Sequence, residues 1–167
     1  RESHARADRA RAEAGCAIFT ASLSTLEARP ELWDEVFGPS SIVIVCPGAD
    51  DLERAARRLH GHLTASIHAT AAELESNRQL VAALERHVGR IVFNGFPTGI
   101  EVCAAMHHGG PWPATTDVRY TSIGTASIER FVRPVCYQGF PQPALPAELQ
   151  DVNTRGIWRL VDGVRCR

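Results

Sequence analysis

The segment Ser41–Asn94, SIVIVCPGADDLERAARRLHGHLTASIHATAAELESNRQLVAALERHVGRIVFN, decides the fold class of this chain. It opens with Ser41–Cys46, a run dominated by β-branched residues, which is typical of a strand buried on both faces. Short apolar runs at Leu63–His68 and Arg90–Asn94 predict further strands. Because helix-forming stretches with short connections separate these runs, the segment predicts a parallel sheet with crossover helices, an α/β fold.

Both helices of this segment are marked by signals at their ends. Capping-box patterns open them: Asp50 with Glu53, and Thr70 with Glu73. In such a box the first side chain accepts a hydrogen bond from the backbone N–H three residues later. Gly61 and Gly89 are typical helix stops. We therefore expect helices over about 50–60 and 70–88.

The flanking segments carry shorter patterns. We expect helices over Arg1–Gly15, from Thr98 to about His107 and over Ser122–Val132, and strands at Cys16–Thr20 and Val135–Gln138. A connecting stretch follows the first of these strands through Pro30. Proline-rich Gly110–Thr116 predicts a loop, and the prolines after Gly139 predict an extended tail.

The composition is that of one globular domain. The 167 residues are 44% hydrophobic and 22% charged, with a formal charge of -1, which argues against binding nucleic acid or an anionic membrane through bulk charge. The sequence contains no run of about 18 apolar residues, the length that a membrane-spanning helix needs. All 18 basic residues are arginine, so a P-loop or a Schiff-base lysine is excluded. Five cysteines without a CxxC pair predict free thiols and a cytoplasmic protein.

Side chains with reactive or metal-binding groups form few clusters. The histidines pair as His60 with His62 and His107 with His108, and neither spacing converges as a metal site requires, so we expect no metal. Cys103 and His107 would lie one turn apart on the expected helix, where a thiol and an imidazole could form a nucleophilic pair. The loops after Cys46 and Asn94 follow strands at the edge where open α/β sheets bind ligands.

Several blocks of the sequence resemble the aldehyde dehydrogenase superfamily. Glu35–Pro39 (EVFGP) is similar to its E-x-F-G-P signature, and Gly89–Asn94 (GRIVFN) resembles its glycine, strand and asparagine block. Longer blocks resemble the branch of α-ketoglutaric semialdehyde (2,5-dioxovalerate) dehydrogenases and their long-chain fatty-aldehyde relatives. These blocks are Asn94–Cys103, His108–Thr115, Thr121–Thr125, Arg133–Gln138 and Asp151–Gly163. The chain thus resembles the C-terminal third of such an enzyme.

The resemblance implies roles for a few residues. Glu35 would accept hydrogen bonds from the nicotinamide-ribose hydroxyls of NADP or NAD, and Phe37 would lie beside the nicotinamide ring. Without the family, Phe37 is better interpreted as a core residue. Phe96 and Trp112 would line the aldehyde pocket. In this superfamily a cysteine attacks the aldehyde and a glutamate activates the hydrolytic water. The resemblance places both upstream, and Cys16 lacks their G-Q-x-C setting, so we expect no catalytic residue here.

The resemblance also implies an organisation. Residues 1–133 would form the C-terminal half of the catalytic α/β domain, and residues 134–167 an oligomerisation strand and an extended tail that join a dimer or tetramer. Because the chain begins with Arg1 and its only methionine is Met106, we expect a piece of a longer polypeptide, inactive by itself. The parent would oxidise α-ketoglutaric semialdehyde or a similar aldehyde to the acid with NADP or NAD. The alternative is a non-catalytic oligomerisation or scaffold module.

Overall fold

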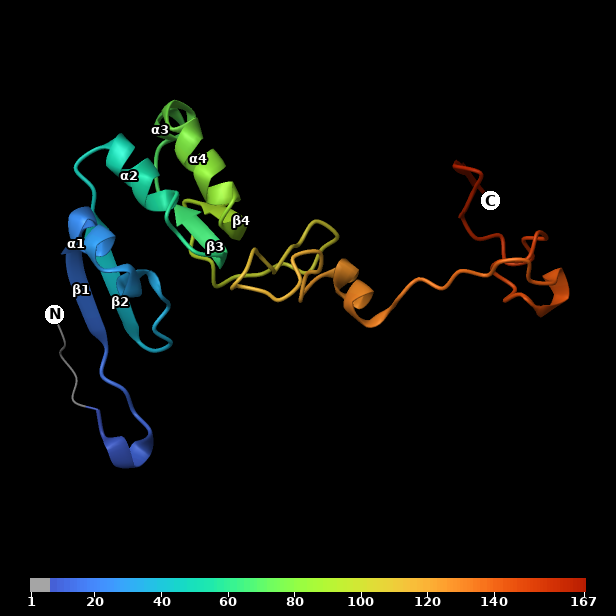
Figure 1. The fold of residues 1–167 in the computed structure, drawn as a ribbon, viewed down its shortest axis with the longest axis horizontal. Coiled ribbons are helices and arrows are strands. Elements are labelled where there is room, and N and C mark those ends of the chain that lie inside the picture. Colours follow the sequence, from blue (N-terminus) through green and yellow to red (C-terminus); the bar gives the residue numbers. More distant parts are fainter. Residues whose placement is uncertain (1–6) are drawn as a thin grey trace. The chain divides into compact units, whose positions relative to one another are not determined.

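The computed structural model describes residues 7–167, which divide into a first unit ending at Phe131 and a second unit, Val132–Arg167 (Figure 1). The first unit holds two parallel two-stranded sheets with helices, and the second holds a two-stranded antiparallel sheet. The predicted mixed α/β class and the parallel pairing are confirmed. The sheets are small and separate, however, so the structure contains parallel pairs of strands in place of one continuous sheet.

The first parallel sheet pairs β1 (Ala17–Ser22) with β2 (Ser40–Val45). The connection between them contains helix α1 (Leu23–Ala28) and the 3₁₀ helix η2 (Pro30–Trp33). Helix α1 begins where the Ser22 hydroxyl accepts a hydrogen bond from Thr25 N at 3.2 Å, a serine cap. The strand expected at 16–20 is confirmed and extends to Ser22, whereas the stretch expected to be a plain connection contains this helix.

The second parallel sheet pairs β3 (His62–Ile67) with β4 (Val88–Phe93). Helix α2 (Ala49–Ala56) precedes it, and helices α3 (Ala71–Ser76) and α4 (Arg78–Glu85) form the crossover between its strands. The strands expected over 63–68 and 90–94 are therefore confirmed with small shifts. Gly89, expected to end a helix, lies inside β4 instead.

The two predicted capping boxes have different outcomes. Thr70 and Glu73 form theirs: Glu73 N donates to Thr70 Oγ1 at 3.2 Å, and Thr70 N donates to Glu73 Oε2 at 2.8 Å. The bond from the Thr70 backbone lowers the pKa of Glu73. The box at Asp50 is wrong, because α2 begins after Gly48 and Asp50 lies within its first turn. The single helix over 70–88 is also wrong, since Asn77 breaks it into α3 and α4.

Several expectations for the flanking segments are corrected by the structure. Residues 98–107 form turns and loop in place of an α-helix, and the helix over 122–132 is the 3₁₀ helix η3 (Thr125–Phe131). Within the described part of Arg1–Gly15, only a short 3₁₀ turn, η1 (Arg9–Arg11), is helical, and residues 1–6 lie outside the described residues. Residues 135–138 form no strand.

The second unit contains elements that the expected tail did not include. These are the 3₁₀ turn η4 (Gln142–Ala144) and the antiparallel strands β5 (Arg159–Val161) and β6 (Val164–Cys166). The turn between the strands places Asp162 and Gly163 at φ 49° and 80°, and such positive angles favour residues like glycine and aspartate. Across residues 7–167, no helix is long and apolar enough to cross a membrane.

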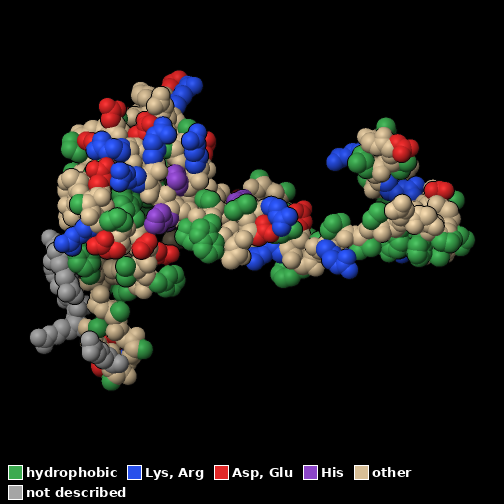
Figure 2. All heavy atoms as spheres, in the orientation of Figure 1, with side chains coloured by type: hydrophobic (Ala, Val, Ile, Leu, Met, Phe, Trp, Pro, Cys, Tyr) green, Lys and Arg blue, Asp and Glu red, His purple; other side chains and the backbone are tan. Residues whose placement is uncertain are grey.

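The buried core is small. Its members are mostly alanines with a few larger aliphatic residues: Ala17, Leu23, Leu26, Ala55, Ala56, Ala83 and Val88. The expectation that the second strand is buried on both faces is wrong, because Val43 and Val45 of β2 are 47% and 60% exposed. A sheet of two strands offers little cover for its own faces, and Figure 2 accordingly shows hydrophobic side chains at the surface of the first unit.

Leu26 tests whether this small core stabilises the first unit. Its side chain is only 1% exposed, so Leu26→Ala should lower the free energy of unfolding by about 2–5 kcal/mol. Leu52→Ala is the matched control, because Leu52 lies on α2 and is 45% exposed. Urea unfolding followed by far-UV circular dichroism measures both variants, and equal effects of the two would contradict a core centred on Leu26.

Candidate functional site

A groove of about 880 Å³ lies beside β2 and contains two of the predicted site residues. Its lining comes mainly from η2, the following loop and β2: Phe19, Leu26, Glu31, Leu32, Trp33, Asp34, Glu35, Val36, Phe37, Gly38, Ser40, Ser41, Ile42, Ile44, Leu59 and His62. Glu35 and Phe37 are both among these residues. The groove therefore joins the residues of the E-x-F-G-P block to an apolar sheet surface.

The loop that carries these residues, Asp34–Pro39, is held at both ends. Before it, Trp33 Nε1 donates to the Leu26 carbonyl at 3.1 Å, which fastens η2 to the buried end of α1. After it, Ala17 N donates to the Pro39 carbonyl at 3.0 Å, which joins the loop to the start of β1. The loop is consequently positioned by both the helix and the sheet while its middle stays open.

The middle of this loop makes few contacts with the rest of the chain. Phe37 is 97% exposed, so its interpretation as a core residue is wrong for this chain. Glu35 is also exposed, and no described side chain pairs with its carboxylate. An unpaired carboxylate beside an exposed aromatic ring offers hydrogen-bond acceptors and a flat apolar surface to a ligand.

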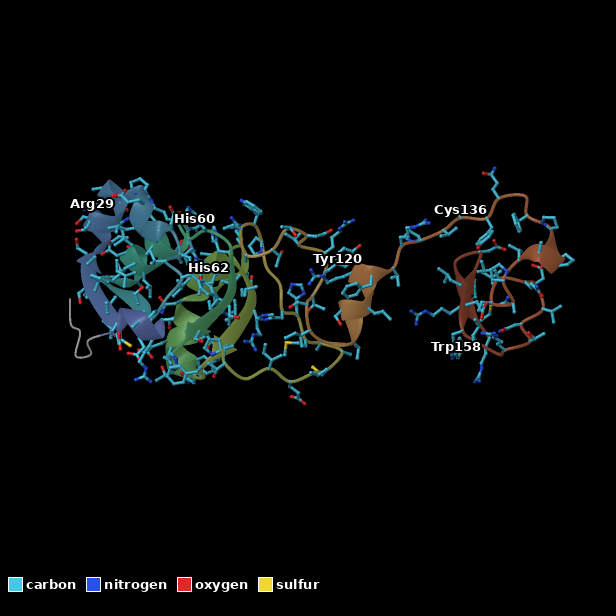
Figure 3. All side chains as sticks on the ribbon, turned by 90° about the horizontal axis from the view of Figure 1, so that it is seen from below. Arg29, His60, His62, Tyr120, Cys136 and Trp158 are labelled. Carbon is cyan, nitrogen blue, oxygen red and sulfur yellow. The ribbon has the colours of Figure 1, made fainter. Side chains whose placement is uncertain are left out.

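The charge of the groove is negative. Three carboxylates line it, those of Glu31, Asp34 and Glu35. Two imidazoles lie near these carboxylates: His60 Nδ1 is 3.5 Å from Asp34 Oδ1, and His62 lines the groove. His60 lies in the connection from α2 to β3, and His62 is the first residue of β3 (Figure 3). Carboxylates attract hydroxyl and amine donors and repel phosphates, so this lining suits the hydroxyl groups of a sugar.

The other two predicted pocket residues lie outside this groove. Phe96 follows β4 and is 80% exposed, with its ring centroid 5.5 Å from that of His68. Trp112 is 73% exposed and belongs to a loop at the other end of the sheet. That loop lies against Gly61, where a Cβ atom would overlap the carbonyl groups of Pro111 and Trp112. The structure thus places Phe96 and Trp112 at opposite ends of the β3–β4 pair.

The alternative thiol site and a metal site find no support in the geometry. Cys103 and His107 do not share a helix, and Met106 N donates to the Cys103 carbonyl at 3.2 Å in a turn of this segment. The helix that would have placed this thiol and imidazole one turn apart is therefore absent. The five cysteines are free, as expected. Within residues 7–167, no group of three or more histidine, cysteine or acidic side chains could hold a metal ion.

A buried threonine that sequence reasoning missed organises the loop of Trp112. Thr121 is 4% exposed, and its Oγ1 accepts from His108 N at 2.8 Å and donates to the Ile123 carbonyl at 2.6 Å. Ser122 N donates a hydrogen bond to the His108 carbonyl at 2.9 Å. No local pattern signals this role, because the hydrogen bonds to His108 join residues 13 and 14 positions apart.

Two curated proteins are similar to nearly all of this chain. Alpha-ketoglutaric semialdehyde dehydrogenase 2 of Azospirillum brasilense is 46% identical over 151 residues, which cover 90% of the chain and 29% of the relative. Alpha-ketoglutaric semialdehyde dehydrogenase of Acinetobacter baylyi is 51% identical over 148 residues, which cover 88% of the chain and 28% of the relative. The chain is homologous to a segment of these dehydrogenases. No protein-family model matches it.

This homology confirms the resemblance that the sequence blocks predicted. The chain spans less than a third of the length of either relative, 29% and 28%. The E-x-F-G-P block lies on the groove loop, and the GRIVFN block covers most of β4 and the asparagine that follows it. These two blocks therefore lie at the groove and at the carboxyl end of the second sheet.

A surface ion pair near Thr121 makes a testable prediction about pH. Asp117 accepts hydrogen bonds from Arg119 Nε at 2.9 Å and Nη2 at 2.6 Å, which lower its pKa from 3.8 to about 2. Because the folded-state pKa is depressed, any stabilisation is present above about pH 4 and is lost as the pH falls through about 2. The carboxyl ¹³C shift of Asp117 should titrate with a midpoint of about 2. In Arg119→Met the midpoint should return towards 3.8, and equal midpoints would contradict the pairing.

Proposed function

We propose that this chain is part of an NAD(P)-dependent dehydrogenase that oxidises α-ketoglutaric semialdehyde, or a similar aldehyde, to the carboxylic acid. The observation that carries this proposal is 46% and 51% identity, over about nine-tenths of the chain, to relatives named for that activity. Since the chain spans less than a third of those relatives, we assign the activity to a longer protein that contains this chain, called the longer protein or longer enzyme below.

The groove beside β2 is the proposed binding place for the nicotinamide ribose of NADP or NAD. Its residues fit that group, because Glu35 has free acceptor oxygens and Phe37 offers an exposed ring on the same anchored loop. The acidic lining fits hydroxyl donors and disfavours the phosphates, which other parts of the enzyme would bind. When bound, the cofactor supplies the electron acceptor for oxidation of the aldehyde.

The residues of this chain would bind and orient the cofactor and the aldehyde. Glu35 would hold the sugar hydroxyls in a charge-assisted fork, and Phe37 would limit the movement of the adjacent ring. Phe96, exposed at the carboxyl edge of β3 and β4, would contact the aldehyde, whereas Trp112 lies at the opposite end and is left out of this pocket. We place the nucleophile and the general base elsewhere in the longer protein.

Assembly into a homo-oligomer is supported by the surface of the second unit. Large hydrophobic side chains are exposed along it, including Val135 (56%), Phe140 (47%) and Trp158 (70%). Burying such side chains against a second copy would remove apolar surface from water. The same observation favours the alternative function, a non-catalytic oligomerisation or scaffold module, so activity must separate the two.

Glu35→Gln in the longer enzyme tests the cofactor role. The amide keeps the size of the side chain but loses the charge-assisted acceptor, so the KM for NADP or NAD should rise by about tenfold. Glu75→Gln is the matched control, because Glu75 is an exposed carboxylate on α3 paired with Arg78 at 3.0 Å. Unchanged cofactor affinity in Glu35→Gln, measured by steady-state kinetics and direct titration, would contradict the role.

The isolated 167-residue chain separates the enzyme proposal from the scaffold alternative. With α-ketoglutaric semialdehyde and NADP it should produce no NADPH above background, because we place the nucleophile outside it. The longer protein should produce NADPH under the same conditions. If the longer protein is inactive while the isolated chain self-associates in sedimentation experiments, the scaffold function is favoured. Steady NADPH production by the isolated chain would refute our division of roles.

A further inference from the structure

The loop Gly95–Gly99, directly after β4 and Asn94, is fastened on both sides of an exposed aromatic ring. Phe96 is 80% exposed, yet hydrogen bonds from the side chains of Asn94 and Arg90 hold the residues before and after it. An exposed ring buries little surface within this chain. Its fixed position therefore indicates that the ring contacts a molecule or segment outside the core of this chain.

Asn94 holds the start of the loop. Its Nδ2 donates to the Ala69 carbonyl at 2.9 Å and its Oδ1 accepts from Ala69 N at 2.9 Å, so one side chain satisfies both backbone groups. Its own N–H donates to the Ile67 carbonyl at 2.8 Å. The φ of 49° is left-handed, a conformation that asparagine adopts more readily than most residues. These contacts join the segments that follow β3 and β4.

Arg90 holds the far side of the loop from within β4. Its Nη2 donates to the Pro97 carbonyl at 2.6 Å, and its Nη1 donates to the Gly99 carbonyl at 3.0 Å. The rigid guanidinium fork can reach both carbonyls together, which the single ammonium group of a lysine does less well. Arg90 Nε is buried and has no acceptor among the described residues.

The ring that these contacts hold lies beside an imidazole. The planes of Phe96 and His68 are tilted by 52°, with centroids 5.5 Å apart. His68 directly follows β3, so the pair lies at the carboxyl edge of the parallel strands, where α/β proteins bind their ligands. The ring pair forms a surface with an apolar part and a hydrogen-bonding part.

We propose that Arg90 is a positioning residue for aldehyde specificity, which holds the Gly95–Gly99 loop so that Phe96 and His68 form one wall of the aldehyde pocket. The inference rests on the proposed function. Phe96 would pack on the methylene groups of the substrate, and the imidazole would face its polar end. Arg90 touches neither, and it acts by keeping the ring where the substrate needs it.

A double-mutant cycle in the longer enzyme tests this role through KM. Arg90→Met should raise the aldehyde KM by about tenfold and leave kcat within about twofold, since it removes ground-state positioning and no reacting group. Phe96→Ala should do the same. Because Arg90 acts through Phe96, the double variant should be no worse than Phe96→Ala alone. Arg90→Lys, which keeps the charge, should raise KM less. Arg78→Met is the control, an exposed arginine on α4 that should leave KM unchanged.

Amide hydrogen exchange in the 167-residue chain provides a readout that does not depend on activity. In Arg90→Met the amides of Asn94 and Ala69, which donate hydrogen bonds at the base of the loop, should exchange on the order of tenfold faster, as expected when the loop is released. Amides of β3 and α4 should keep their rates, which shows that the fold persists.

The outcomes separate the two proposals. Effects of Arg90→Met and Phe96→Ala on KM that simply add would overturn the positioning role, and so would loop exchange rates that do not change. A longer enzyme that oxidises no aldehyde would instead refute the proposed function. The hydrogen exchange would then still decide whether Arg90 holds the loop, and a failure to do so would overturn this inference as well.

Discussion

Parallel pairing of neighbouring strands is the constraint on which the rest of this structure depends. Two parallel strands cannot be joined by a tight turn, so each pair requires a longer crossover connection. Between β1 and β2 that connection carries α1, η2 and the loop Asp34–Pro39, and between β3 and β4 it carries α3 and α4. Parallel strands also end at the same edge, which is why Asn94 after β4 can bind Ala69 after β3. Both candidate binding regions are thus consequences of strand direction.

The same pairing explains why so much apolar surface stays open. A parallel strand normally has both faces covered, and β2 has the β-branched composition suited to that environment. In this chain β2 has one partner strand, and Val45 is 60% exposed. The composition of β2 is typical of a buried strand, but the described residues of this chain leave side chains of β2 exposed. The chain spans 28–29% of the length of the dehydrogenases to which it is similar.

Local signals predicted those elements whose stabilising contacts are also local. The Thr70 capping box joins residues three positions apart, and the strand runs alternate with helices at spacings that allow few other folds. The helix expected after Thr98 did not form, and the segment is bounded by contacts with residues far away in the sequence. Arg90 binds the carbonyls of Pro97 and Gly99, and His108 exchanges hydrogen bonds with Thr121 and Ser122. Backbone groups that find partners elsewhere in the fold do not need a helix.

The sequence by itself determined the α/β class, the parallel pairs, the position of the E-x-F-G-P block before a strand and the homology to semialdehyde dehydrogenases. These properties depend on residue type and short spacing, which a linear chain displays directly. Only the tertiary structure decided that Glu35 and Phe37 share a groove, that Phe96 and Trp112 lie at opposite ends of a sheet, and that Arg90 holds the Phe96 loop. Each of these depends on contacts between residues that strand pairing and chain reversal bring together, and the order of residues along a chain does not contain those distances.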